Sequence, residues 1–266
     1  IWTEHLKKGL LKMGFIQSIA DPCVFYRGKL IFLHFVDDCI CLSPDSADID
    51  KFIADLKAAK FDVTDEGELS DYLGVKIEKL PEGKIKLSQP HLINQILDDL
   101  GLNLPNTVDK PTPALSTRIV SRDVDGKPFN EKWEYRSVIG KLNFLEKSTR
   151  LDLGYAAHQC ARFSTNPKES HATAVKRIGR YLKGTRDQGL ILSPADYSFE
   201  VFVDADHSGN WKIGESEDDD ATAKSRTGYV IKYAGCPVVW HSKLQTCIAL
   251  SSTEAEYVSL SASLRD

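Results

Sequence analysis

Residues 30–42 read LIFLHFVDDCICL, with an apolar run on each side of Asp37 and Asp38. This pattern predicts two strands, 30–36 and 39–42, in a hairpin that carries both acids at its tip. Tight hairpin turns prefer Asn-Gly or Asp-Gly because the backbone there needs positive φ, and this tip has no Gly. Adjacent carboxylates on a rigid hairpin can hold divalent metal ions, which align a hydroxyl with a phosphate for in-line displacement. An incidental acidic turn is the alternative, and these residues alone favour neither.

The rest of the first half predicts a mixture of helices and strands. Helical spacing of apolar residues and turn residues such as Gly, Pro and Asp set the boundaries. The expected elements are a helix around 6–13, a strand at 24–26 with a turn at 27–29, a helix through residues 49–56 capped by Asp45 or Ser46, strands at 72–80 and 84–87 joined by residues 81–83, and a short helix at 91–100.

The second half predicts a helical region followed by a second region of short strands. Residues 102–130 are rich in Pro, Thr, Asp and Asn, which indicates an extended connection. Two or three helices follow at 131–183, and Lys176, Arg180 and Lys183 share one face of the last. The strands expected next are 190–192, 199–203, 228–233 and 238–241, with an acidic loop at 209–225 and a final helix at 251–264.

Composition is that of a soluble globular protein. The 266 residues are 42% hydrophobic and 27% charged, which suits two domains, and no apolar run is long enough to span a bilayer. The six Cys show no C-x-x-C spacing, so we expect reduced thiols rather than zinc or disulfides. The net charge is −4, but residues 132–186 hold twelve Lys or Arg against four acids, a local charge of +8.

Many stretches along the chain resemble, in the same order, the reverse transcriptase and RNase H segment of copia-type LTR retrotransposon polyproteins. The similar blocks are residues 14–15 with 20–22 (GF, ADP), 35–38 (FVDD), 73–74 with 87–89 (LG, LSQ), 135–140 (YRSVIG), 166–167 (NP), 180–185 (RYLKGT), 204–206 (DAD), 225–229 (SRTGY) and 249–257 (ALSSTEAEY). So many ordered blocks are far more specific than any one of them.

The resemblance implies that Asp37 and Asp38 are the paired polymerase carboxylates, which bind Mg²⁺ or Mn²⁺. It also implies that residues 72–87 position the primer end. The family's other polymerase Asp lies on a strand that would precede Ile1. Because Ile1 stands in place of Met and Asp266 lies within a predicted helix, we expect both ends of the chain to be cut.

In the second region, the resemblance implies that Asp204 and Glu256 are metal-binding carboxylates of an RNase H site. A capping role is the alternative for Glu256, because Thr253-x-x-Glu256 and Ser251-x-x-Glu254 both match the capping-box pattern. We expect one of the two Glu to cap the helix and Glu256 to reach the metal. Asp206 is expected to support the site without binding metal, and the family's remaining carboxylates lie beyond this helix.

The basic residues Lys176, Arg177, Arg180 and Lys183 are the candidates for binding a nucleic-acid backbone. The resemblance places them in a thumb that tracks the phosphates of a primer–template duplex, and a solvated basic face is the alternative. The chain departs from the usual family pattern at four positions: Phe35 replaces Tyr, Cys39 replaces Met, Leu151 replaces Pro and His207 replaces Trp.

Together these observations predict an α+β protein in three segments. Residues 1–101 form a partial palm, 102–193 a connection with a helical thumb, and 194–266 the first half of an RNase H-like mixed α/β domain. The expected parent function is RNA-directed DNA synthesis from deoxynucleoside triphosphates, with degradation of the RNA/DNA hybrid. We expect this chain to be inactive alone, in the cytoplasm within a virus-like particle or in the nucleus, as a dimer or in a polyprotein, and away from membranes. A catalytically inactive nucleic-acid-binding remnant is the alternative.

Overall fold

The computed structural model describes residues 2–115, 120–214, 216–217 and 219–265. Glu215 and Asp218 of the predicted acidic loop therefore lie outside the described residues. Contacts divide the chain into two compact units, Ile1–Leu73 and Gly74–Asp266. The predicted division into segments 1–101, 102–193 and 194–266 stays a prediction. No helix in the described ranges combines the length and the apolar character that a membrane crossing needs.

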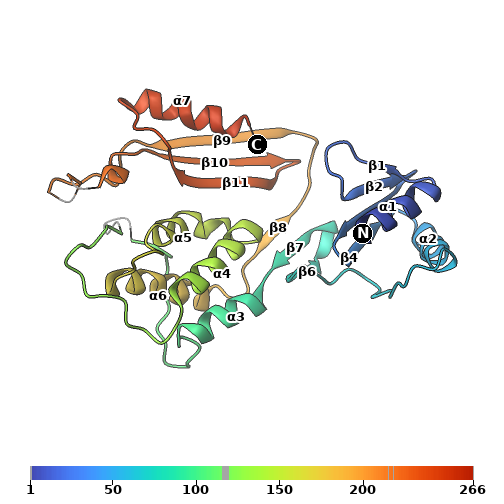
Figure 1. The fold of residues 1–266 in the computed structure, drawn as a ribbon, viewed down its shortest axis with the longest axis horizontal. Helices are drawn as coiled ribbons and strands as arrows, with labels where there is room; N and C mark the ends of the chain where they lie inside the picture. The colour runs from blue at the N-terminus through green and yellow to red at the C-terminus, as the bar shows by residue number, and fades with distance from the viewer. Residues whose placement is uncertain (1, 116–119, 215, 218, 266) are drawn as a thin grey trace. The chain divides into compact units, whose positions relative to one another are not determined.

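The first unit packs helices against a four-stranded antiparallel sheet of order β1-β2-β3-β4 (Figure 1). Its elements are α1 (Trp2–Lys12), β1 (Ile16–Gln17), β2 (Val24–Arg27), β3 (Leu30–Phe35), β4 (Asp38–Leu42), α2 (Ser46–Ala58) and β5 (Asp71–Tyr72). Burial alternates along β3, as expected when one sheet face meets a core. The core is formed by Leu6, Leu10, Phe15, Phe25, Leu30, Phe32, Phe52, Leu56 and Phe61. Asp45 caps α2 through the Ala47 N–H, as one of the two predicted caps.

The predicted hairpin of residues 30–42 is present, with a small change at its tip. β3 pairs with β4 from Ile31 opposite Leu42 to Phe35 opposite Asp38. The turn is therefore Val36-Asp37, so that Val36 leaves the predicted first strand and Asp38 joins the second. One carboxylate sits in the turn and the other on the last strand pair.

The second unit begins with a hairpin and a group of helices. Its first elements are β6 (Val75–Lys79), the 3₁₀ turn η1 (Pro81–Gly83), β7 (Ile85–Ser88), α3 (Pro90–Asp99), α4 (Tyr135–Ser148), η2 (Leu151–Leu153), α5 (Gly154–Ala161), α6 (Glu169–Gly184) and β8 (Leu190–Leu192). β7 pairs antiparallel with both β6 and β8. The described part of 102–130 holds no helix, and its one β-bridge joins Pro128 to Lys168. The structure thus confirms the predicted helices of residues 131–183 and the absence of a helix in the described part of 102–130.

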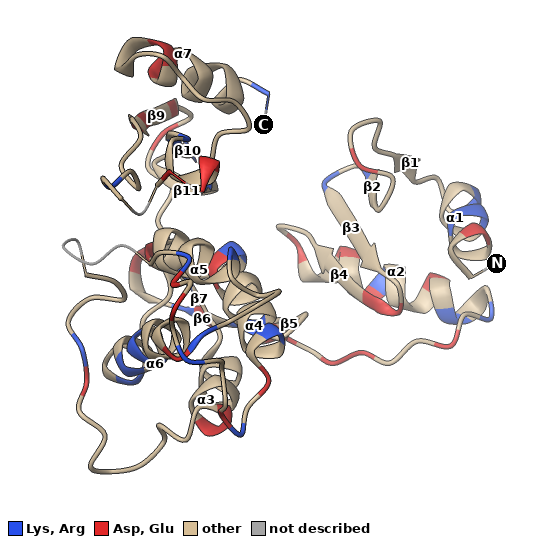
Figure 2. Ribbon diagram, turned by 60° about the vertical axis from the view of Figure 1, so that its left-hand side comes forward, with Lys and Arg blue, Asp and Glu red and all other residues tan. Residues whose placement is uncertain are grey.

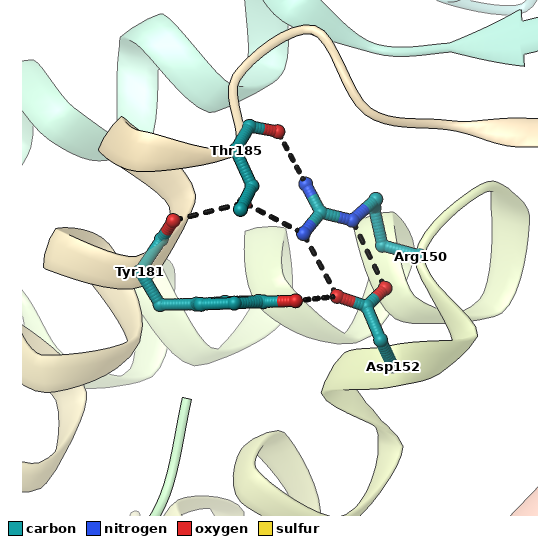
Figure 3. A network of polar contacts seen from close by, with 4 residues as sticks. All are labelled: Arg150, Asp152, Tyr181 and Thr185. Carbon is teal, nitrogen blue, oxygen red and sulfur yellow. Dashed lines mark hydrogen bonds and ion pairs between the residues drawn. The ribbon is translucent and has the colours of Figure 1, made fainter. Parts of the chain in front are cut away.

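A buried polar network ties the turn after α4 to the end of α6 (Figure 3). Arg150 is 1% exposed, and its guanidinium forms two hydrogen bonds, of 2.9 and 2.8 Å, with the carboxylate of Asp152. Arg150 also donates to the Thr185 carbonyl and hydroxyl oxygens, at 3.0 and 2.8 Å. Tyr181 completes the network, because its hydroxyl donates to Asp152 at 2.8 Å. A buried guanidinium whose donors are satisfied in this way fixes two chain segments in register.

The C-terminal part is a three-stranded antiparallel sheet covered by a helix. Its elements are β9 (Phe199–Asp206), η3 (Asp220–Thr222), β10 (Arg226–Tyr233), β11 (Cys236–Leu244) and α7 (Ser252–Ser263), and the strand order is β11-β10-β9. α7 lies along β9 and β10 (Figure 1), where the Ser259 and Thr227 hydroxyls are 3.0 Å apart. The opposite face meets the helices: the Trp240 indole donates to the Glu146 carbonyl at 3.0 Å.

Candidate functional site

The hairpin tip that carries Asp37 and Asp38 has a strained backbone. Val36 has a φ of 56°, whereas Asp37 is not among the residues with positive φ, and this is the φ pattern of a type II′ turn. That turn favours Gly at its first central position, because a β-branched side chain clashes there with the backbone. Such strain costs about 1–3 kcal/mol and persists only where the surrounding structure enforces it.

A tryptophan from α1 holds this turn in place. The Trp2 indole N–H donates to the Val36 carbonyl at 2.9 Å. The Trp2 ring lies edge-on to Phe61 with 6.4 Å between ring centroids, and Phe61 belongs to the core of the first unit. The tip is therefore connected to the core by a contact 34 residues away in sequence. An isolated Trp at a helix start gives no sequence signal for such a role.

The side chains beside the two carboxylates are neutral. Burial first, and then the charges of Asp38 and Asp37, raise the pKa of the Cys39 thiol to about 11. Burial and the nearby Cys39 and Asp38 also raise the pKa of Tyr72 above its ordinary value. Asp37 and Asp38 are both exposed. The tip thus has two accessible carboxylates beside a protonated thiol and a phenol. Of these groups, the carboxylate oxygens are the ligands that a hard cation prefers.

Three of the four predicted nucleic-acid-binding residues on α6 bind the chain's own connection or its flanking residue, and these are Lys176, Arg177 and Lys183. The Lys176 ammonium is 2.6 Å from the Glu131 carboxylate. The Lys183 ammonium donates to the Leu104 and Thr107 carbonyls at 2.7 and 2.8 Å. Figure 2 colours these basic residues of α6 blue. Their helical spacing was correct, but the connection lies against part of the face that they form.

Arg177 and Arg180 differ from Lys176 and Lys183 because both line a cavity. The Arg177 guanidinium donates to the Thr112 hydroxyl at 2.8 Å, and its Nε is buried without a partner. Neither arginine forms an ion pair with another residue in the described ranges. Both line a cavity between α6 and the connection. A role of these four residues in binding nucleic acid stays a prediction.

The start of α7 resolves which glutamate caps the helix. The Ser251 hydroxyl accepts from the Glu254 N–H at 3.1 Å, and the Glu254 carboxylate accepts from the Leu250 N–H at 2.7 Å. Glu254 is therefore the capping acid, and the capping box is Ser251-x-x-Glu254, one of the two predicted patterns. Glu256 is exposed and takes no part in the cap.

Asp204 and Glu256 lie on neighbouring elements but do not touch. Asp204 is exposed on β9 and pairs across the sheet with Gly228, so it shares the face of Asp206 and Arg226, whereas α7 covers the other face. No hydrogen bond or ion pair joins Asp204 to Glu256 among the described residues. Within those ranges, no three His, Cys, Asp or Glu side chains cluster closely enough to hold a metal ion. The metal-binding assignments of Asp37, Asp38, Asp204 and Glu256 stay predictions.

Comparison with known proteins supports the resemblance seen in the sequence. A sequence model of the family described as reverse transcriptase (RNA-dependent DNA polymerase) matches residues 1–114. The chain is 33% identical to the retrovirus-related Pol polyprotein from transposon TNT 1-94 of Nicotiana tabacum, over 97% of this chain and 19% of that protein. It is also 33% identical to the corresponding polyprotein from transposon RE1 of Arabidopsis thaliana, over 97% of this chain and 17% of that protein. No solved structure matches the chain.

A third relative is much closer to this chain in length. The Ty5-1 transposon protein of Saccharomyces cerevisiae is 27% identical over 98% of this chain and 82% of that protein. The chain spans about a fifth of the length of the two plant polyproteins. The match at residues 1–114 and the polyprotein matches along nearly the whole chain agree, and the chain belongs to the reverse transcriptase family of retrotransposon Pol polyproteins.

Proposed function

We propose that this chain supplies the paired carboxylates of an RNA-directed DNA polymerase within a retrotransposon Pol polyprotein. The observation that carries the proposal is the strained Val36 beside Asp37 and Asp38, held by Trp2. Most type II′ turns have Gly at this position, which removes the strain. Strain that a distant contact maintains is typical of sites where the position of a side chain matters more than stability.

The donor set at the tip fits a magnesium or manganese ion. Both ions prefer carboxylate oxygens, and Asp37 and Asp38 present two exposed carboxylates next to each other. When bound, such ions activate an attacking hydroxyl and neutralise charge on the transferring phosphate. The residues of this chain contribute by holding both carboxylates at a fixed tip. The Cys39 thiol is protonated, so it does not compete with the carboxylate oxygens for the cation.

We extend the proposal to hydrolysis of RNA/DNA hybrids in the C-terminal part. Asp204 stands on β9, which is the open edge of its sheet, and Glu256 stands on the helix that lies along β9. The proposed partners are Mg²⁺ or Mn²⁺, a primer–template duplex or RNA/DNA hybrid, and deoxynucleoside triphosphates. The proposed setting is a virus-like particle or the nucleus, in a dimer or a polyprotein.

The test follows Mn²⁺ binding to the whole chain by paramagnetic broadening of backbone amide signals. We expect Mn²⁺ to broaden the signals of residues 35–40 and the Asp37→Asn and Asp38→Asn variants to lose this effect. Asp62→Asn, which removes an exposed acid from the same unit, is the matched control and should keep it. Equal broadening in all variants would overturn the polymerase proposal.

Primer extension separates the proposal from the inactive remnant. The polyprotein that contains this chain should extend a primer on an RNA template in the presence of Mg²⁺. The Asp37→Asn variant should lose primer extension and keep its affinity for the duplex. Duplex binding by that protein with no extension, and no Mn²⁺ at the tip, would establish a remnant instead.

A further inference from the structure

A cavity of about 360 Å³ lies between the connection and the helices α5 and α6. One wall is formed by connection residues that include Lys110, Ala114 and Asp123, and the other wall is formed by faces of the two helices. The α6 residues Ser170, Thr173, Ala174 and Arg177 lie at helical spacing along one face. A volume of this size is within the range of sites that hold small ligands. The predicted polymerase and nuclease residues do not line it.

Three cations border this cavity. Lys110, Arg177 and Arg180 all line it, and none has a carboxylate partner among the described residues. The buried Nε of Arg177 lacks any hydrogen-bond acceptor there. One acid lines the cavity, Asp123, and the Ser170 hydroxyl already donates to it.

The rest of the cavity wall is largely apolar. Ala156 and Ile178 belong to the core of the helical region, and Ala174 packs against that core. Small alanines on both helices leave a smooth surface at which a flat ring can lie. Gln159 offers no free amide hydrogen, because its NH₂ group donates to Tyr155 and Asn210. The cavity thus combines a cationic part with an apolar part, and this favours an anion that carries a flat body.

We propose that this cavity binds one phosphorylated nucleoside, with the phosphate at Lys110, Arg177 and Arg180 and the base against the apolar wall. Three cations match the dianionic charge of a phosphate monoester better than the single charge of a carboxylate. Two sources share this chemistry, a free mononucleotide and the 5′-phosphorylated end of an unpaired strand. The inference goes beyond the polymerase proposal and needs neither metal ions nor the carboxylates at the hairpin tip.

The test measures binding to the whole chain by calorimetry in EDTA. The probes are deoxyadenosine monophosphate, inorganic phosphate, deoxyadenosine and a short 5′-phosphorylated DNA strand. We expect the mononucleotide to bind at least about tenfold more tightly than phosphate or deoxyadenosine, because only it engages both parts of the cavity. The same affinity in Asp37→Asn would show that the result is independent of the polymerase proposal.

Variants locate the binding. Arg177→Gln and Arg180→Gln should each weaken mononucleotide binding by about tenfold, the value of one charge-assisted hydrogen bond. Arg136→Gln removes an exposed cation from α4 and is the matched control that should bind normally. Ala174→Leu fills the cavity without changing charge and should block the mononucleotide, and circular dichroism checks that it is folded.

The two sources give different results. If the cavity receives strand ends, the phosphorylated strand should bind more tightly than the mononucleotide and compete with it, and Ala174→Leu should weaken both. If it receives free nucleotide, the strand should not compete. Mononucleotide binding no tighter than that of phosphate, or unaffected by Ala174→Leu in a folded chain, would overturn the inference.

Discussion

The indole N–H of Trp2 donates a hydrogen bond to the carbonyl of Val36, so the first turn of α1 holds a strained turn of the β3–β4 hairpin. The contact explains how a β-branched residue keeps a φ of 56°. The rigidity of the tip can therefore be tested separately from its carboxylates, because the hydrogen bond can be removed without changing Asp37 or Asp38.

Trp2→Phe should loosen the hairpin tip while the core of the first unit stays intact. The phenyl ring can keep the edge contact with Phe61, but the donor to Val36 is lost, at a cost of about 1 kcal/mol. Amide hydrogen exchange of residues 35–39 should accelerate severalfold. Trp211→Phe, at a half-exposed position in the other unit, should leave exchange at the tip unchanged. Unchanged exchange in Trp2→Phe would show that the contact does not hold the turn.

Val36→Gly should stabilise the chain by about 1 kcal/mol. Relief of about 1–3 kcal/mol of strain exceeds the extra backbone entropy of Gly in the unfolded chain, about 0.4–1 kcal/mol. Val108→Gly, at an exposed Val without positive φ, should be slightly destabilising. Urea unfolding followed by circular dichroism measures both. If both variants lose the same stability, Val36 is not strained.

Arg150→Met should destabilise the second unit by about 3 kcal/mol, because it leaves Asp152 partly buried without its cation. Arg136→Met, which changes an exposed arginine on α4, should stay within about 0.5 kcal/mol of the parent chain. Thermal and urea unfolding of the two variants give the comparison. A loss below about 1 kcal/mol in Arg150→Met would contradict a structural role for the network.

Asp152 also predicts a dependence of stability on pH. Burial alone would raise the pKa of Asp152, but the hydrogen bonds and charge of Arg150 outweigh burial and hold it below its ordinary value of 3.8. A carboxyl with a depressed folded pKa stabilises the fold above its unfolded pKa, and this contribution disappears as pH falls through the folded pKa. Stability should therefore fall below about pH 3.8, and the fall should be shallower in Arg150→Met. Equal slopes in the two proteins would rule out this linkage.

Cys39 should react slowly with alkylating reagents although it is exposed. Partial desolvation by the surrounding chain and the charges of Asp38 and Asp37 raise its pKa to about 11, so little thiolate is present at neutral pH. Iodoacetamide labelling followed by peptide mass spectrometry should show a rate that rises about tenfold per pH unit between pH 7 and 9. Replacement of both aspartates by Asn should increase the rate, and a rate that stays constant with pH would contradict the raised pKa.

Local patterns predicted the elements, and distant contacts decided the details of the site. The apolar alternation around Asp37 and Asp38 predicted the hairpin, and Asp45 was one of two predicted caps. The capping pattern fitted both Glu254 and Glu256, and the hydrogen bonds that Glu254 forms with Leu250 and Ser251 identify it as the capping acid. The contact of Trp2 with Val36 has no local signature, because it depends on how α1 packs beside the hairpin.

The basic face of α6 shows the same limit. The sequence predicted which basic residues share this face, since residues three and four apart are neighbours on a helix. Which of its cations remain available depends on where the connection lies, and residues 102–130 have no periodicity that predicts a path. Lys183 is occupied by carbonyl groups of that connection, whereas Arg177 and Arg180 open onto a cavity.

The strained turn also bears on the history of the element. Val and Gly codons differ by one base, so relief of the strain at position 36 is always a single mutation away. In copies that selection no longer maintains, that mutation carries no penalty and slightly improves folding. Selection for folding alone would therefore favour Gly at this position, and retention of Val is the expected mark of selection on the proposed carboxylate site.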